Sequence, residues 1–191
     1  LEKAMVTVYD QALKETIRQA KTVPVLINYT ANGKRHEKNP DKADLALIAK
    51  IDAVEIPYWY PTDHLPNGFN TRQPMESHKY THVHHFYTKR NVWVIAAIFK
   101  NCHLPVLAFL FSSTLYNLTN LYRWRANGKG GTTSGTYYVC STPQENNPFN
   151  SFHTKLNDIC RCFFSPTLKN IFTVNSTTQL LISNDSIDYI F

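Results

Sequence analysis

The sequence has little cysteine: four in 191 residues, at Cys102, Cys140, Cys160 and Cys162. Their small number and uneven spacing exclude a disulfide framework, and the first residues carry no secretory-leader pattern. No second pair stands at zinc-site spacing from Cys160 and Cys162. We therefore interpret all four as reduced thiols, and Cys160 and Cys162 as buried structural thiols, with metal ligation by that pair as the alternative. A cytoplasmic location is expected.

Long apolar runs are also missing. The longest, residues 104–118, falls short of the roughly 20 residues that a membrane helix needs, so we expect no membrane association. No Gly-Lys-Ser/Thr opens a helix, which excludes a phosphate loop. The polar interruptions of the apolar run are Ser112, Ser113, Thr114 and Asn117.

The composition that is present indicates an ordered, basic domain. The apolar fraction is 43% and the aromatic fraction 13%, which argues against disorder. The length suits one hydrophobic core, or a core with a small appendage. A net charge of +6 and a pI near 9.1 favour an anionic partner, of which nucleic acid is the commonest.

Residues 82–99 combine a polar, cationic segment with a predicted buried helix. Their first half is rich in hydrogen-bonding and cationic groups, and their second half is apolar on every side, as in a buried helix. Thr88 is placed to cap that helix by accepting from free backbone N–H groups. The positive end of the helix dipole there favours an anionic or carboxylate-bearing ligand.

The first 55 residues predict a hairpin and a helix. Residues 1–24 fit either a helical stripe or strands. Further on, 25–30 and 34–38 flank an Asn-Gly turn and should pair. Pro40 suits the first position of a helix that ends near Val54.

Residues 56–81 form a segment rich in proline and aromatic side chains. The prolines and an Asn-Gly pair predict no long regular element between 56 and 80. We interpret the segment as an ordered loop over the core, with a substrate-facing loop as the alternative. Its prolines are Pro57, Pro61, Pro66 and Pro74, and its aromatic residues include Tyr58, Trp59, Tyr60 and Phe69.

A histidine cluster, His82, His84 and His85, raises the question of a metal. In a strand, His82 and His84 would share a face. No carboxylate or cysteine stands near them in the sequence to complete a ligand set. We predict hydrogen-bonded or substrate-facing histidines and no metal, with metal binding as the alternative.

A second helix is predicted from about Pro105 to Arg123. Cations and aromatics meet at its end, in Arg123, Trp124 and Arg125, and a glycine-rich loop with Lys129 follows. This pattern suits contact with phosphates and stacking on an unpaired base. The alternative is an ordinary helix end, with arginine complementing the dipole and glycine as the cap.

The last third predicts strands around one helix. We expect a strand at 136–140, a helix that opens at 147–148 and ends before Pro166, and strands at 171–174 and 187–191. Strands alternating with helices indicate a parallel α/β sheet. Because the chain stops in mid-strand, we expect a fragment of a longer protein.

Several segments together resemble bacterial DNA methylases of the N-4/N-6 type. The segments are 23–29, 57–61, 81–91 and 184–191, and the last resembles the lead-in strand to the catalytic Asp-Pro-Pro-aromatic motif of those enzymes. The resemblance implies an S-adenosylmethionine-dependent DNA methyltransferase that acts on adenine N6 or cytosine N4. It also implies an α/β fold with a partial Rossmann-type sheet after a small N-terminal β-containing segment. The implied parts are 1–55, 56–81 and 82–191, which together could form one domain.

The resemblance also assigns residues. It places cofactor contacts at Tyr87, Thr88 and Asn91, with Lys89 where related enzymes have proline, and by position at Asn175 and Ser176. No catalytic residue lies in this chain, which we expect to be inactive alone. No protein partner is identifiable. A noncatalytic nucleic-acid-binding module and a structural insertion are the alternatives. The candidates for contact with DNA are Lys89, Arg90, Arg123, Trp124, Arg125 and Lys129.

Overall fold

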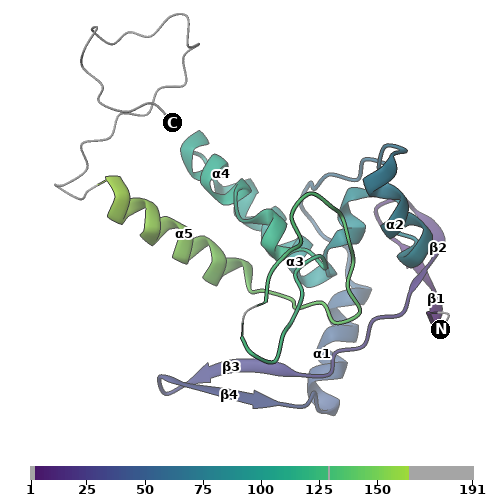
Figure 1. Cartoon of the computed structure of the whole chain (residues 1–191), viewed down its shortest axis with the longest axis horizontal. Coiled ribbons are helices and arrows are strands. Elements are labelled where there is room, and N and C mark those ends of the chain that lie inside the picture. Colours follow the sequence, from purple (N-terminus) through teal and green to yellow (C-terminus); the bar gives the residue numbers. More distant parts are fainter. Residues whose placement is uncertain (1–2, 129, 164–191) are drawn as a thin grey trace, which may run out of the picture. The chain divides into compact units, whose positions relative to one another are not determined.

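A computed structural model of the chain describes residues 3–128 and 130–163, in which helices and small antiparallel sheets are mixed (Figure 1). The chain divides into two compact units, Leu1–Leu156 and Asn157–Phe191. Both hairpins and the candidate site belong to the first unit. The predicted mixture of helices and strands is confirmed. The strands predicted at 171–174 and 187–191 lie outside the described residues.

Two separate β-hairpins open the chain (Figure 1). Strand β1 (Met5–Asp10) pairs with β2 (Glu15–Ala20), so the ambiguous N-terminus is extended rather than helical. Strand β3 (Ile27–Ala31) pairs with β4 (Lys34–Lys38), which confirms the second predicted hairpin. Its turn residues have positive φ angles, 51° at Asn32 and 71° at Gly33. Asparagine and glycine tolerate that conformation, and it matches the twist of the paired strands.

Helix α1 (Lys42–Ala53) follows directly. Asp41 is the N-cap, because its side chain accepts from the backbone N–H groups of Ala43 and Asp44, and the Asp44 carboxylate in turn accepts from the backbone N–H of Asp41. This reciprocal pair is a capping box. Pro40 therefore precedes the cap instead of opening the helix. The predicted end near Val54 is confirmed.

Helix α2 (Phe69–His78), ten residues long, lies within 56–80, where the prolines predicted no long regular element. Pro74 lies inside this helix and removes one backbone donor. Its side chain is among the most deeply buried, so its packing offsets the lost hydrogen bond. The helix ends where Lys79 takes a left-handed φ of 60° and its backbone N–H donates to the carbonyl of Pro74.

The central helix α3 (Lys89–Asn101) follows the 3₁₀ turn η1 (Val83–Phe86). The Thr88 side chain accepts from the Asn91 backbone N–H at 3.3 Å, so the predicted cap is confirmed. His84 and His85 lie in η1 and His82 is its N-cap, so the strand in which His82 and His84 would share a face does not form.

Two predictions for the next elements are wrong. The helix expected over 105–123 is α4 (Pro105–Ser112) followed by the 3₁₀ turn η2 (Leu115–Leu118). The hydroxyls of Ser112, Ser113 and Thr114 each donate to a carbonyl three residues earlier, which competes with helix continuation. No strand forms at 136–140, where the Val139 N–H donates to a side chain, Gln73 Oε1. The last predicted helix is confirmed as α5 (Pro148–Phe163).

Two hydrophobic clusters form the core. Phe86 and Leu121 belong to one, Val92 and Ala96 to the other, and Tyr87 packs against both. Cys160 is exposed, so the burial predicted for it is wrong, whereas Cys140 is buried. Among the helices that the structure describes, none has the length and hydropathy of a membrane span.

Candidate functional site

A buried carboxylate joins the first hairpin to the histidine turn. The Oδ2 atom of Asp10 lies 2.8 Å from His84 Nε2 and 3.0 Å from His85 Nε2. Its Oδ1 atom accepts from the backbone N–H groups of Ala12, at 2.9 Å, and Leu13, at 3.2 Å. Only 8% of the Asp10 side chain is exposed. Both oxygens of this carboxylate are therefore satisfied by two donors each, as a buried charge requires.

Local structure sets up each half of this cluster. Asp10 ends β1, and its bonds to Ala12 and Leu13 hold the tight turn into β2. In η1, the Nδ1 atom of His85 accepts from the backbone N–H of Thr81 at 3.1 Å and of His82 at 3.4 Å. The ring of His85 is thereby fixed with Nε2 directed at the carboxylate.

Hydrogen bonding keeps Asp10 ionised. Burial acts to raise the pKa of Asp10, but hydrogen bonds from His84, His85 and the Leu13 backbone outweigh burial and lower that pKa to about 2. Burial lowers the pKa of His85 to about 4, although its hydrogen bond to Asp10 acts in the opposite direction. At neutral pH the pair is thus an aspartate anion and a neutral imidazole.

These bonds determine which histidine nitrogens carry protons. Nδ1 of His85 faces two N–H donors and must accept, so in the neutral ring the proton is on Nε2. His84 Nε2 must likewise donate to the ionised Asp10. The Nδ1 atom of His84 is buried and has no hydrogen-bond partner. The ring of Tyr60 packs edge-on beside His84, with centroids 6.0 Å apart.

The same three side chains come close enough together to hold a metal ion, with their ligand atoms within 4.8 Å of one another. A metal on His85 Nε2 would require the ring proton to move to Nδ1, where it would point at two backbone N–H groups. That conflict favours the hydrogen-bonded form over coordination. The cluster can anchor β1 and η1 to each other, and of its four histidine ring nitrogens only His84 Nδ1 has no hydrogen-bond partner.

Sequence reasoning missed Asp10. It found no carboxylate near the histidines, because Asp10 stands 74 residues before His84. No local pattern marks this aspartate. The available signal was its place at the end of an alternating apolar run, where a tight turn requires a side-chain acceptor.

The predicted cofactor residues lie at the start of α3. Thr88 is occupied as the N-cap, and Asn91 is buried, donating to the carbonyls of Leu118 at 3.2 Å and Asn146 at 3.1 Å. Burial raises the pKa of Tyr87 to about 12, so its hydroxyl is neutral. The structure brings Tyr87, Thr88 and Asn91 together. Asn175 and Ser176 lie outside the described residues.

Two of the predicted DNA-contacting cations are occupied within the fold. Lys89 Nζ donates to the side chain of Gln11 and, at 2.8 Å, to the carbonyl of Asp52. Arg90 forms an ion pair with Glu145, with its Nε 3.0 Å from Oε1. Both side chains thus bind other parts of the first unit.

The other predicted DNA contacts lie around a loop whose ends are paired. The Arg123 backbone exchanges hydrogen bonds with Gly131, and its Nε atom is buried without a partner. A side chain at Gly130 would approach the Arg123 carbonyl to 2.6 Å, so glycine is required there. Trp124 and Arg125 are exposed. Lys129 lies outside the described residues.

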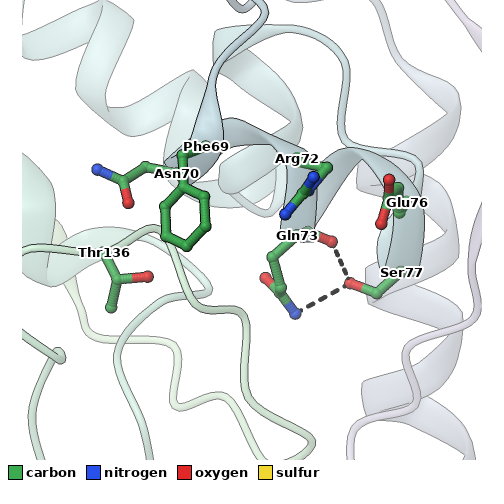
Figure 2. Close-up of a pocket in the computed structure, with 7 residues that line it drawn as sticks. All are labelled: Phe69, Asn70, Arg72, Gln73, Glu76, Ser77 and Thr136. Carbon is green, nitrogen blue, oxygen red and sulfur yellow. Dashed lines mark hydrogen bonds between the residues drawn. The ribbon is translucent and has the colours of Figure 1, made fainter.

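A shallow surface pocket lies along α2 (Figure 2). The ring of Phe69 is 84% exposed, and the guanidinium of Arg72 lies 5.6 Å from the ring centroid. Gln73 and Ser77 bond to each other at 3.0 Å (Figure 2). The pocket is open to solvent and has no buried polar group directed into it, so it is a weaker candidate than the Asp10 cluster.

Comparison with known proteins gives no match: no family model, curated protein or solved structure matches this chain.

Proposed function

We propose that this chain is part of an S-adenosylmethionine-dependent DNA methyltransferase that modifies the exocyclic amine of adenine or cytosine. In the whole enzyme it contributes core and DNA-facing surface. An Asp-Pro-Pro-aromatic tetrad is absent from these residues. The proposal includes a Rossmann-type sheet formed with residues beyond those the structure describes.

One observation carries the proposal beyond the resemblance itself. Two segments that resemble such enzymes, 57–61 and 81–91, are separated by residues 62–80 and meet at one hydrophobic cluster. Tyr58 and Tyr60 from the first segment and Tyr87 from the second pack against the buried cluster of Ile56, Val92 and Ala96. Segments that belong to one structural unit are expected to resemble a family together, whereas chance similarities would be scattered over the fold.

The residues in hand fit the cofactor only in part. The Asn91 amide is bound to two backbone carbonyls, so it supports the loop rather than contacting a ligand. The Tyr87 hydroxyl remains for contact with the methionine end, and Thr88, whose oxygen accepts as the N-cap, keeps its O–H as a donor. When bound, S-adenosylmethionine supplies the methyl group. This chain's role is to fix the start of α3 beside it and to bind DNA.

Methyl transfer is the direct test. The full-length gene product and the 191-residue chain are incubated with labelled S-adenosylmethionine and mixed-sequence DNA. We expect label in DNA from the full-length product only, because the tetrad that positions the amine is missing from the shorter chain. An inert full-length product, or an active short chain, would contradict the proposal.

A noncatalytic nucleic-acid-binding module is the second candidate. The exposed Trp124 and Arg125, side by side at a loop, favour it, since stacking and phosphate contact need no catalytic group. Inactivity of the full-length product, together with salt-dependent DNA binding that Arg125→Ala weakens, would select this alternative.

A further inference from the structure

The β3–β4 hairpin, which we name the ribbon (residues 27–38), is exposed on both faces. Only Ile27, Ala31 and Lys38 of its two strands are half-buried, and every other strand residue is exposed. A two-stranded hairpin without a covered face is marginal in water by itself. Such a hairpin gains stability when something binds it.

One face of the ribbon carries an amide, a hydroxyl, a guanidinium and a carboxylate, which are all groups that can hydrogen-bond to base edges. In the register, Asn28 lies opposite Glu37 and Thr30 opposite Arg35, so these four share a face. Arg35 donates from Nε and Nη2 to Asn28 Oδ1, at 3.2 and 3.1 Å. Arginine and asparagine are the residues that make paired hydrogen bonds with guanine and adenine in the major groove.

The other face and the base of the ribbon complete the arrangement. Tyr29 stacks on His36 with ring centroids 5.3 Å apart. Lys34 follows the turn directly and is exposed. At the base, Lys38 Nζ lies 3.2 Å from Asp41 and 2.7 Å from Asp44, which ties the ribbon to the start of α1. The tip is thus cationic and the base is fixed.

We propose that the ribbon inserts into the major groove of duplex DNA, with Asn28 and Arg35 toward base edges and Lys34 toward phosphates. The groove is about 12 Å wide and admits a two-stranded β-ribbon, whose strands lie about 4.8 Å apart. This inference rests on the proposed function for its partner. It assigns recognition to residues far in sequence from the arginines at 123–125.

The test measures binding of the 191-residue chain to a labelled mixed-sequence duplex against salt concentration. The double variant Lys34→Ala with Arg35→Ala should weaken duplex binding about tenfold at moderate salt and reduce the salt slope by roughly 1 to 2. The matched control is Arg18→Ala, which removes an exposed strand arginine from the other hairpin and should change affinity less than twofold. Circular dichroism checks that each variant is folded.

Three outcomes overturn the ribbon proposal: no duplex binding by the chain, ribbon variants within twofold of the unaltered chain, or tighter binding to single strands than to duplex. The methyl-transfer assay is independent of this one. If the full-length product transfers methyl groups but the ribbon variants bind duplex DNA as tightly as the unaltered chain, the ribbon proposal is wrong and the proposed function stands.

Discussion

The two hairpins of this chain have the same topology and opposite surroundings. The β1–β2 hairpin is held through Asp10, whose carboxylate accepts two hydrogen bonds from η1 in a buried cluster. The β3–β4 ribbon is held at its base by the exposed ion pairs of Lys38, and its faces are open to solvent. One hairpin is built into the fold, and the other leaves its side chains available for a partner.

The difference lies in where each hairpin's polar groups find partners. When a buried polar group loses its hydrogen-bond partner, the folded state bears the full desolvation free energy of that group. An exposed polar group that loses its partner forms hydrogen bonds with water instead. Changes around Asp10 should therefore act on stability, and changes on the ribbon should act on binding.

The largest expected effect comes from Asp10→Ala. It leaves the N–H groups of His84 and His85 and two backbone donors without their acceptor, so we expect a loss of about 3 kcal/mol in the free energy of unfolding. Urea unfolding measures it. The matched variant on the ribbon, Asn28→Ala, should cost under about 0.5 kcal/mol. Equal losses for both variants would remove the distinction between the hairpins.

Lowering the pH should reduce the stability that the buried cluster contributes to the fold. The pKa of His85 is lowered from 6.5 to about 4. Between these two pH values, His85 is therefore protonated in the unfolded chain and neutral in the folded chain. Stability is complete above pH 6.5 and falls as the pH drops toward 4, by up to about 3 kcal/mol for this group. His78, whose pKa burial also lowers to about 4, acts in the same direction.

Asp10 adds a smaller loss at lower pH. Its pKa is lowered from 3.8 to about 2, so its contribution to stability disappears as the pH falls through that range.

Urea unfolding at steps of half a pH unit between pH 4 and 7 measures the contribution of the histidines. A flat curve over this range would contradict a neutral His85.

Zinc should not stabilise the first hairpin. Because His85 Nδ1 accepts two backbone hydrogen bonds, its Nε2 keeps a proton and is not available to a metal. A molar excess of Zn²⁺ should therefore shift the melting temperature by less than about 1 °C. Binding at a hundred times the dissociation constant would add about 2.7 kcal/mol, a shift easily measured. Such a rise, abolished by Asp10→Ala, would show that the cluster is a metal site.

A local effect, with little change in the global unfolding midpoint, is expected from Gly33→Ala. The φ angle of 71° at Gly33 strains any other residue, although a Cβ there meets nothing within 4 Å. The strain of about 1 kcal/mol should fall on the ribbon alone. Backbone amides of residues 27–38 should exchange with solvent faster, while the global unfolding midpoint moves little. A large drop in that midpoint would mean that the ribbon is part of the core.

Local patterns in the sequence were sufficient to predict those structural features that depend on neighbouring residues alone. Asn32-Gly33 predicted the ribbon's turn, and Thr88 predicted the start of α3, because turn geometry and capping involve neighbouring residues. The helix around Pro74 was missed because its stability comes from burial, which no local rule reports. The serines that end α4 were read only as interruptions of an apolar run.

Only the histidine half of the candidate site could be predicted from the sequence. His84 and His85 stood out as a cluster, but their partner Asp10 is brought to them by tertiary packing across 74 and 75 residues. Likewise, Lys89 and Arg90 looked available for phosphates until the structure placed Asp52 and Glu145 beside them. Charge on a sequence shows where cations are, whereas the fold determines which of them are already paired.

Hydrogen exchange of the two hairpins, with and without duplex DNA, tests the central comparison most directly. Without DNA, we expect the amides of β1 and β2 to be better protected than those of β3 and β4. Adding duplex DNA should slow exchange at 27–38 and leave residues 5–20 unchanged. DNA-dependent protection confined to the first hairpin, or absent from both, would contradict the account.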